Sequence, residues 1–296
     1  MVQVIKKGVF TTLQTLPVSG WRSYGVSPRG PMDIFAHGMV NQVLGNDADA
    51  VVMEMHFPAA RLQFMAPCRF ALGGGDFGAL LNEQPAPLWK PVEAMPGDGL
   101  RFTGIKKGFR TYLGVQGGFD VPLSRYSNEG LQDNVLLSIG KVQKVAAVVV
   151  DEATIPIIYS SENQVNCMAG PEYDWLSEDS KTLLTTTNFT ISPAGNRMGL
   201  PLQGESLQRV HAAELLSGPV AMGTVQLLPN GQCMALTADH NTTGGYPRII
   251  TILTNELPKL AQLQPGQLFR FKLVDTETAT EKYLRFVQQL NIQPWQ

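Results

Sequence analysis

The chain contains the stretch Val26-Ser27-Pro28-Arg29-Gly30-Pro31-Met32-Asp33 and a similar one, Ile191-Ser192-Pro193-Ala194-Gly195-Asn196-Arg197-Met198-Gly199, about half a chain later. Two further pairs of stretches repeat in the same order and at similar offsets: residues 71–76 with 235–239, and residues 96–102 with 265–271. Similar segments that keep their order and spacing are typical of a duplicated structural unit. The sequence therefore predicts an internal repeat, in which the two Ser-Pro-x-Gly turns are equivalent elements of two barrels.

Short apolar and β-branched runs separated by turn residues predict a mainly β chain. The 29 glycines and 20 prolines of the chain agree with this, because both residue types interrupt helices and favour turns. Strands are expected over residues 8–13, 61–64, 69–72, 100–102, 111–115, 142–150, 154–159, 224–228, 233–237, 248–253 and 267–273. Asn230-Gly231 is typical of a tight hairpin turn within residues 227–232. The spacing of strands and turns favours barrels or sandwiches.

A few short helices are expected around these strands. Asp33 is placed to cap a helix over residues 35–44 that Gly45 ends. Further helices are expected over residues 177–184 and 255–263, and a last one begins at Thr278, which has capping-box spacing with Glu281. A polar run that starts at Ser160 is the expected boundary between a first subdomain, residues 1–160, and a second, residues 161–296.

Composition argues against several classes of protein. The net charge of −2 gives no basic field for nucleic acid or for an anionic membrane surface. No run of about 18 apolar residues is present, so no membrane span is expected. Cys68, Cys167 and Cys233 are far apart and lack C-x-x-C spacing, which indicates neither a disulfide framework nor a zinc site. We therefore expect a cytoplasmic protein without a bound metal. Charged residues make up only 16% of the chain, and a surface with so little charge suits a partner.

Two stretches match known binding motifs, but their neighbouring residues argue against nucleotide binding and calcium binding. Residues 73–78 match the dinucleotide pattern G-x-G-x-x-G, but Asn82, Pro85 and Pro87 forbid the helix that would bind pyrophosphate. Glycines of a β turn or bulge are the better interpretation. Residues 239–244 resemble the opening of a calcium loop, but Ile250 stands where a bidentate glutamate is needed.

The densest group of polar residues lies at Thr237-Ala238-Asp239-His240-Asn241-Thr242-Thr243-Gly244-Gly245-Tyr246-Pro247-Arg248, after an expected strand. His240 or Asp239 can move a proton, and Arg248 can pair with a carboxylate or a phosphate. The amides of Gly244 and Gly245 can bind a developing oxyanion. The alternative is a turn whose polar side chains satisfy their own backbone. From the residues alone both interpretations stay open.

Other candidates are single residues. Arg29 and Arg197 each sit at a Ser-Pro-x-Gly turn, so at least one of them is a candidate for contact with a ligand or partner. Glu54 and Asp76 stand in apolar surroundings and are expected to be partly buried carboxylates with partners, most simply in salt bridges. The remaining histidines, His37, His56 and His211, lack ligand spacing and are interpreted as structural.

Six ordered motifs carry a resemblance to a known family: residues 25–33, 114–122, 169–175, 196–199, 223–226 and 242–247. Together they resemble the family of biotin-dependent carboxyltransferases, which is also the family of the second subunit of allophanate hydrolase. This family includes the C subunit of 5-oxoprolinase and the antagonist of the Kip-type histidine kinase inhibitor. The similarity spans essentially the whole chain.

The resemblance implies two tandem cyclophilin-like β-barrel subdomains and a subunit 1 partner of the Kip-inhibitor type. With that partner and a third subunit of the lactam-utilisation type, it implies an ATP-dependent 5-oxoprolinase that converts 5-oxo-L-proline to L-glutamate. ATP would be shared with the partner subunit, and the chain alone would be inactive. Two alternatives stay open: the carboxyltransferase component of a urea carboxylase or allophanate hydrolase system that uses carrier-bound biotin, and a non-catalytic antagonist of a kinase inhibitor.

Under the leading hypothesis the site uses two arginines and the polar loop. The catalytic candidates are Arg197, Asp239, His240 and Arg29, and the substrate-binding candidates are Asn241, Thr242, Thr243, Gly244, Gly245, Tyr246, Arg248 and Gln226. The chain departs from the family pattern in three places. Thr15 follows Gln14 where the family has an acid, Arg29 replaces a serine, and residues 124–144 lack recognisable family elements. The second turn and the loop are the expected functional face.

Overall fold

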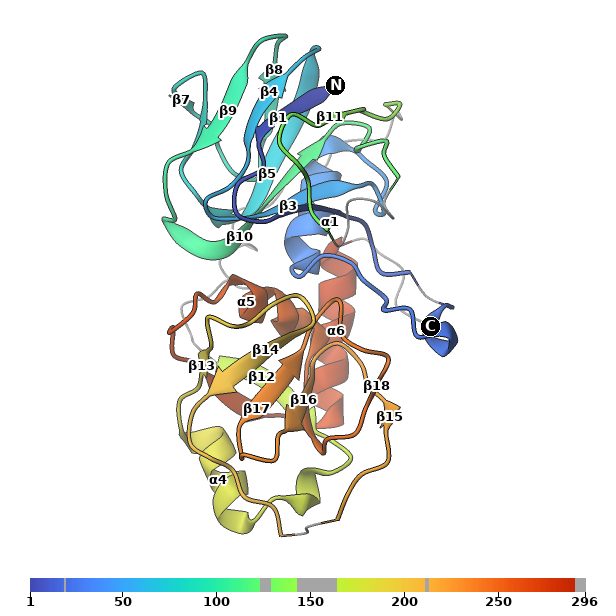
Figure 1. The fold of residues 1–296 in the computed structure, drawn as a ribbon, viewed down its shortest axis with the longest axis vertical. Helices are drawn as coiled ribbons and strands as arrows, with labels where there is room; N and C mark the ends of the chain where they lie inside the picture. Colours follow the sequence, from blue (N-terminus) through green and yellow to red (C-terminus); the bar gives the residue numbers. More distant parts are fainter. Residues whose placement is uncertain (19, 123–128, 143–163, 211–212, 291–296) are drawn as a thin grey trace. The chain divides into compact units, whose positions relative to one another are not determined.

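The computed structural model describes residues 1–18, 20–122, 129–142, 164–210 and 213–290 (Figure 1). The chain divides into two compact units. The first comprises Met1–Leu16, Asp33–Ile157 and Leu290–Ile292, and the second comprises Pro17–Met32, Ile158–Gln289 and Gln293–Gln296. The boundary predicted at residue 160, the strand over 154–159 and all but the first residue of the strand over 142–150 lie outside the described residues, as does His211.

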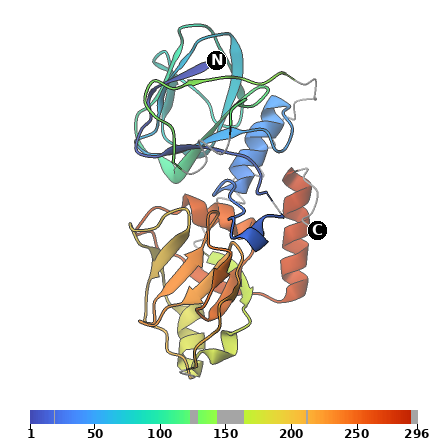
Figure 2. The same cartoon turned by 45° about the vertical axis from the view of Figure 1, so that its right-hand side comes forward.

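The first unit consists of two antiparallel sheets that curl into a barrel-like ring (Figure 2). One sheet has the order β11 (Leu136–Leu137), β1 (Val2–Lys6), β4 (Arg61–Phe64), β9 (Gly99–Phe102), β6 (Ala79–Leu81) and β7 (Gln84–Pro85). The other has the order β2 (Thr11–Gln14), β3 (Val52–His56), β10 (Lys107–Val115), β5 (Cys68–Asp76) and β8 (Pro91–Ala94). Leu13, Met53 and Leu113 lie opposite one another on the neighbouring strands β2, β3 and β10 and share one core.

Helix α1 (Ile34–Leu44) packs against β5 and β10 of the first unit. The predicted cap is confirmed, because the Asp33 carboxylate accepts a hydrogen bond from the Ala36 amide at 2.9 Å, and Gly45 ends the helix with φ of 63°. Gly73 lets the helix approach the sheet, since a Cβ there would lie 2.7 Å from Val40. Gly73 therefore serves strand and helix packing, which agrees with the rejection of a nucleotide motif.

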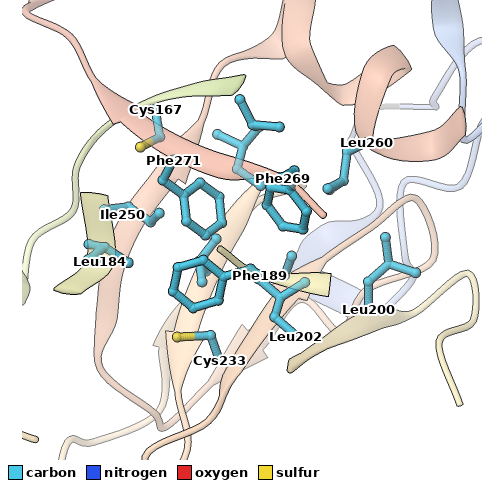
Figure 3. Close-up of a cluster of buried hydrophobic side chains, with 14 of the residues drawn as sticks. Cys167, Leu184, Phe189, Leu200, Leu202, Cys233, Ile250, Leu260, Phe269 and Phe271 are labelled. Atoms are coloured by element: carbon cyan, nitrogen blue, oxygen red, sulfur yellow. The ribbon is translucent and has the colours of Figure 1, made fainter. Parts of the chain in front are cut away.

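The second unit has one curled sheet and a phenylalanine-rich core. Its order is β13 (Thr190–Ile191), β14 (Gly199–Gln203), β17 (Cys233–Leu236), β16 (Thr224–Leu227), β19 (Arg248–Ile252), β12 (Gln164–Ala169) and β20 (Arg270–Leu273). All neighbours are antiparallel except β12 and β20, which run parallel. Figure 3 shows Phe189, Phe269 and Phe271 packed together, with ring centroids 5.2–6.2 Å apart. The mainly β fold with two barrel-like units is thus confirmed.

The helices of the second unit lie close to their predicted places. Helix α4 (Glu178–Thr186) is capped by Ser177, and α5 (Leu257–Gln262) follows the 3-10 turn η3 (Thr254–Glu256). Helix α6 (Thr276–Leu290) begins earlier than predicted, because Asp275 rather than Thr278 supplies the cap. The Asp275 carboxylate accepts the Thr278 amide hydrogen bond at 2.8 Å. Within the described residues, no helix is long and apolar enough to cross a membrane.

The segment Pro17–Met32, which we call the strap, belongs to the second unit although it lies between two parts of the first in the sequence. Its Gly30 carbonyl accepts a hydrogen bond from Arg197 at 2.6 Å, and Ser27 donates to the Ala238 carbonyl at 3.3 Å. Met32 packs with Ala238, Ala261 and Met222 of that unit. Both Ser-Pro-x-Gly turns therefore lie in one unit. Their interpretation as equivalent elements of two barrels is wrong, because contacts of the strap, rather than its place in the sequence, decide its unit.

Glu54 is buried in the first unit, and one of its partners is a tyrosine. The Tyr112 hydroxyl donates to the Glu54 carboxylate at 2.6 Å and accepts from the Asp33 amide at 2.9 Å. Glu54 and Tyr112 face each other across β3 and β10. Burial, together with the nearby Glu54 carboxylate, raises the pKa of Tyr112 well above its ordinary value. Asp76 likewise uses a backbone partner, accepting from the Gly78 amide at 2.8 Å.

We expect Tyr112→Phe to lower the free energy of unfolding by about 1–3 kcal/mol, because the buried Glu54 carboxylate and the Asp33 amide each lose a hydrogen bond. Chemical denaturation of wild type and variant measures this difference. Tyr283→Phe, on helix α6 of the second unit, is the control for loss of a phenolic hydroxyl in a less buried place. Equal stability of Tyr112→Phe and wild type would show that the hydroxyl contributes nothing.

Candidate functional site

The polar loop predicted as a site connects β17 to β19 in the second unit. Its middle forms the short strand β18 (Thr243–Gly244), which pairs with β15 (Gly218–Pro219). The Val220 amide extends this pairing by donating to the Thr242 carbonyl at 3.2 Å. The loop is therefore an ordered element supported along its length by backbone hydrogen bonds.

Arg197 and Asp239, predicted as catalytic residues, form a bidentate ion pair. Arg197 Nε lies 2.8 Å from one Asp239 carboxylate oxygen and Nη2 lies 3.0 Å from the other. Arg197 is 6% exposed, and Nη2 also donates to the Gly30 carbonyl of the strap at 2.6 Å. This planar fork of donors joins the turn before β14, the polar loop and the strap. The geometry makes the pair a clamp that holds these three segments together.

The backbone reinforces this clamp. The Asp239 amide donates to the Arg197 carbonyl at 2.7 Å, so the two residues are joined through both side chain and main chain. The Thr237 hydroxyl donates to the same carbonyl at 2.6 Å. An arginine with these partners has little freedom to reach a substrate, and we assign it a structural role.

His240 follows the clamp and is buried, and one of its ring nitrogens makes no hydrogen bond to the residues that the structure describes. Nδ1 lies 2.5 Å from the Asn241 carbonyl oxygen, which can only accept, so Nδ1 carries the proton. In the neutral ring Nε2 is then the acceptor nitrogen, and the structure gives it no hydrogen-bond partner among the residues that it describes. Burial lowers the pKa of His240 below its ordinary value, against the raising effect of the Asn241 carbonyl. The imidazole is neutral at pH 7 and can accept a proton.

Arg248, at the far end of the loop, is bound to a residue that the sequence did not single out. Its Nε and Nη2 donate to the two carboxylate oxygens of Glu172 at 2.9 and 2.7 Å, and its Nη1 donates to the Pro219 carbonyl at 3.1 Å. The Arg248 guanidinium holds the pKa of Glu172 below its usual value. Glu172 lies within one of the family motifs, but a single acid in that motif gives no signal of its partner. The guanidinium of Arg248 thus makes its hydrogen bonds to other residues of the protein.

Gly244 lies too close to Gln226 to carry a side chain. A Cβ at Gly244 would lie 2.4 Å from Gln226 Nε2, and this amide nitrogen donates to the Tyr246 carbonyl at 3.5 Å. Gln226 is 5% exposed and lies on β16. The glycine and the glutamine together shape the underside of the loop. The amide of Gly244 lies within the β15–β18 pairing, and its predicted role toward an oxyanion stays a prediction.

The outer side of the loop presents polar and aromatic groups. Asn241, Thr243 and Tyr246 are exposed, and Thr242 and Gly245 are half-buried. Together with the buried His240 they form the set that we call the loop face, a nearly continuous run of sequence. The loop face offers hydroxyl and amide groups at the surface and an imidazole below it, while the charged residues Arg197, Asp239 and Arg248 are paired.

Arg29 occupies an unusual backbone position on the strap. Its φ of 59° places it in the left-handed region, and its amide donates to the Ser27 hydroxyl at 3.4 Å. The Gly30 carbonyl that binds Arg197 follows directly. His37 and His56, interpreted as structural, lie in the first unit, and His37 is fully buried. Within the described residues, no group of three or more His, Cys, Asp or Glu is arranged to hold a metal ion.

Comparison with known proteins identifies relatives over the full chain. Residues 24–273 match the protein family described as carboxyltransferase domain, subdomain A and B. The chain is 30% identical to the C subunit of 5-oxoprolinase from Escherichia coli strain K12, over 98% of this chain and 97% of that protein. It is 25% identical to the urea amidolyase of Saccharomyces cerevisiae, over 94% of this chain but 17% of that longer protein.

Solved structures have the same fold. The urea amidolyase of K. lactis superposes with a TM-score of 0.87 and 22% identity, covering 98% of this chain and 20% of that one. A protein named TTHA0988 gives a TM-score of 0.80 and 23% identity, covering 92% of this chain and 55% of that one. In both structures the similar region is part of a longer polypeptide.

Proposed function

Because the chain belongs to the family of carboxyltransferase domains with subdomains A and B, we propose that it is the C subunit of a heteromeric, ATP-dependent 5-oxoprolinase. In this role it would help to convert 5-oxo-L-proline to L-glutamate. The observation that carries the proposal is the 30% identity with the C subunit of the E. coli 5-oxoprolinase, which extends over nearly the whole length of both chains. We further propose that the complex works in the cytoplasm, since Cys68, Cys167 and Cys233 are free thiols.

The proposed complex contains a subunit 1 of the Kip-inhibitor type and a third subunit of the lactam-utilisation type. ATP does not fit the loop face of this chain alone. The arginines beneath it, Arg197 and Arg248, are paired with Asp239 and Glu172, so neither is available for a phosphate. The other subunits must therefore supply the main phosphate ligands, and no step through the nucleotide is assigned to this chain.

The part that we assign to this chain is proton transfer and orientation of the substrate. Opening a lactam requires that water attack the ring carbonyl and that the ring nitrogen receive a proton. In this proposal His240 Nε2, the ring nitrogen left as acceptor by the Nδ1 contact, accepts the proton of the attacking water and returns it to the leaving nitrogen. The hydroxyls of Thr242 and Thr243 and the amide of Asn241 would bind the substrate's carbonyl and carboxylate oxygens. The paired arginines beneath keep the loop face rigid.

Reconstitution tests this proposal. The chain is co-expressed with the subunit 1 and lactam-utilisation proteins of the same organism, and glutamate release is measured with 5-oxoproline, with and without ATP. We expect turnover only when all three proteins and ATP are present. A verified three-protein complex that releases no glutamate would contradict the proposal. Assays that omit one protein at a time are the controls.

A second candidate is favoured by the identity with the yeast urea amidolyase, which is 25% over 94% of this chain. In that case the chain would act as the carboxyltransferase component of a urea carboxylase system, and carboxybiotin on a separate carrier would give its carboxyl group to urea. Adding a biotinylated carrier protein with urea and bicarbonate distinguishes the two. Avidin-sensitive carboxylation of urea supports the second candidate, while ATP-dependent glutamate release without biotin supports the first.

A further inference from the structure

Among the described residues of the second unit, the most exposed aromatic side chains lie on the strap. The 3-10 turn η1 (Arg22–Tyr24) has no buried residue, and Trp21 and Tyr24 are 57% and 76% exposed. Val26 adds a further exposed apolar side chain at 42%. A tryptophan and a tyrosine that contribute nothing to a core are costly to leave in water, and contiguous apolar patches of this kind mark interaction sites. We call Trp21, Tyr24 and Val26 the strap patch.

The strap patch is held rigidly. The Tyr24 amide donates to the Trp21 carbonyl at 3.0 Å, the Gly25 amide donates to the Arg22 carbonyl at 3.0 Å, and Gly25 closes the turn with φ of 76°. The Arg22 guanidinium donates to the Val220 carbonyl, which fixes the turn beside the strand pairing that supports the polar loop. The ring centroids of Trp21 and Tyr24 lie 5.9 Å apart. Rings ordered before binding lose little entropy when they enter a partner's pocket.

The charged residues of the strap itself have one sign. Residues 17–32 contain Arg22 and Arg29 and no aspartate or glutamate. Tryptophan, tyrosine and arginine are also the residue types that dominate binding energy at protein interfaces. A complementary surface would offer an apolar pocket bordered by carboxylates.

We propose that the strap patch docks a second polypeptide with such a pocket, and, resting on the proposed function, that this polypeptide is the Kip-inhibitor-type subunit 1. The lengths of the relatives indicate a protein as the occupant. The region similar to this chain makes up 97% of the E. coli protein but 17% of the yeast urea amidolyase. In the long yeast chain, the remaining parts of the polypeptide are attached covalently to this region. A chain like the E. coli protein can associate with separate polypeptides only by binding them through its surface. The strap is suited to this task because it binds the second unit beside the loop face, so docking also brings the partner to the site.

The test measures binding of purified subunit 1 to the full chain by isothermal titration calorimetry. We expect the double substitution Trp21→Ala, Tyr24→Ala to raise Kd by about 100-fold or more, since each aromatic anchor of an interface typically accounts for tenfold or more. The matched control is Leu268→Ala in the same unit, whose side chain is 51% exposed, and we expect its Kd to stay within about twofold of wild type. At saturating subunit 1 the kcat of the double variant should equal that of wild type.

Three results would overturn the proposal. Unchanged Kd for the double variant, with wild type active, would refute the strap patch and leave the proposed function intact. Self-association of wild type that the double variant abolishes would make a second copy of the chain the occupant. Failure of wild type to bind subunit 1 would refute the docking and the proposed function together, and the reconstitution assay would then also show no turnover. Thermal melts of all variants show whether folding is unaffected.

Discussion

Arg197→Met is expected to lower the free energy of unfolding of the second unit by about 3–5 kcal/mol, because it leaves the Asp239 carboxylate and the Gly30 carbonyl without their buried donor. Methionine keeps much of the apolar volume of the arginine stem, so the loss reports on the ion pair rather than on a cavity. The strap should loosen at the same time, since its Gly30 contact is broken. Chemical denaturation measures the stability, and limited proteolysis measures cleavage within residues 17–32.

Arg101→Met is the matched control for this experiment. Arg101 pairs with Glu83 in the first unit, but both side chains are exposed, at 39% and 68%. Exposed pairs contribute about 0–1 kcal/mol, so this variant should be nearly as stable as wild type. If Arg197→Met were as stable as Arg101→Met and its strap resisted protease, Arg197 would not be a clamp. Its predicted role in catalysis would then regain weight.

The sequence predicted those parts of the fold that depend on local chemistry. The Asp33 cap and the Asn230-Gly231 hairpin each follow from two or three neighbouring residues. Strand β12 was missed because its residues follow a polar run and alternate with polar side chains. Strand β3 was missed because Glu54 interrupts its apolar pattern, and the partner that makes this burial tolerable, Tyr112, lies far along the chain.

The strap shows where sequence reasoning ends. The repeated turn was interpreted as a sign of duplication, and its place was assigned by position in the chain. Three hydrogen bonds from Arg22, Ser27 and Arg197 place it on the second unit instead. Each of these bonds joins residues that are far apart in the chain, so no local pattern contains them. Long-range contacts of this kind decide tertiary placement after local preferences have set the elements.

The polar loop was found because many functional groups lie close together in its sequence. This density does not tell which residues support the loop and which contact a ligand. The charged members Asp239 and Arg248 lie in bidentate ion pairs, whose partners come from other parts of the second unit. The uncharged members Asn241, Thr242, Thr243, Gly245 and Tyr246 lie on the loop face. This division has a physical reason, because a buried charge needs a fixed partner whereas hydroxyls and amides remain useful at an exposed surface. It leaves His240 as the titratable group of the loop that can accept a proton near pH 7.

Replacing His240 is therefore expected to have the largest effect on activity. In the reconstituted complex, His240→Asn should lower kcat by about 10²–10⁴-fold, the usual contribution of a general base. Asparagine can keep a donor near the position of Nδ1 for the Asn241 carbonyl, but it has no group that accepts a proton at Nε2. The variant thus removes the proposed chemistry while preserving the loop's own hydrogen bond. Steady-state glutamate release at saturating 5-oxoproline and ATP measures the effect.

The pH dependence separates catalysis from structure. Because burial lowers the pKa of His240 below 6.5, wild-type kcat/KM should be constant near pH 7 and fall only as the pH drops through that lowered pKa, where the ring becomes protonated. In His240→Asn this acidic limb should disappear, and added imidazole should restore part of the rate. Tyr246→Phe, which alters another member of the loop face, should keep the limb. A His240→Asn enzyme with more than half the wild-type kcat and the same pH profile would make His240 a support of the loop, and the base would then have to come from another subunit.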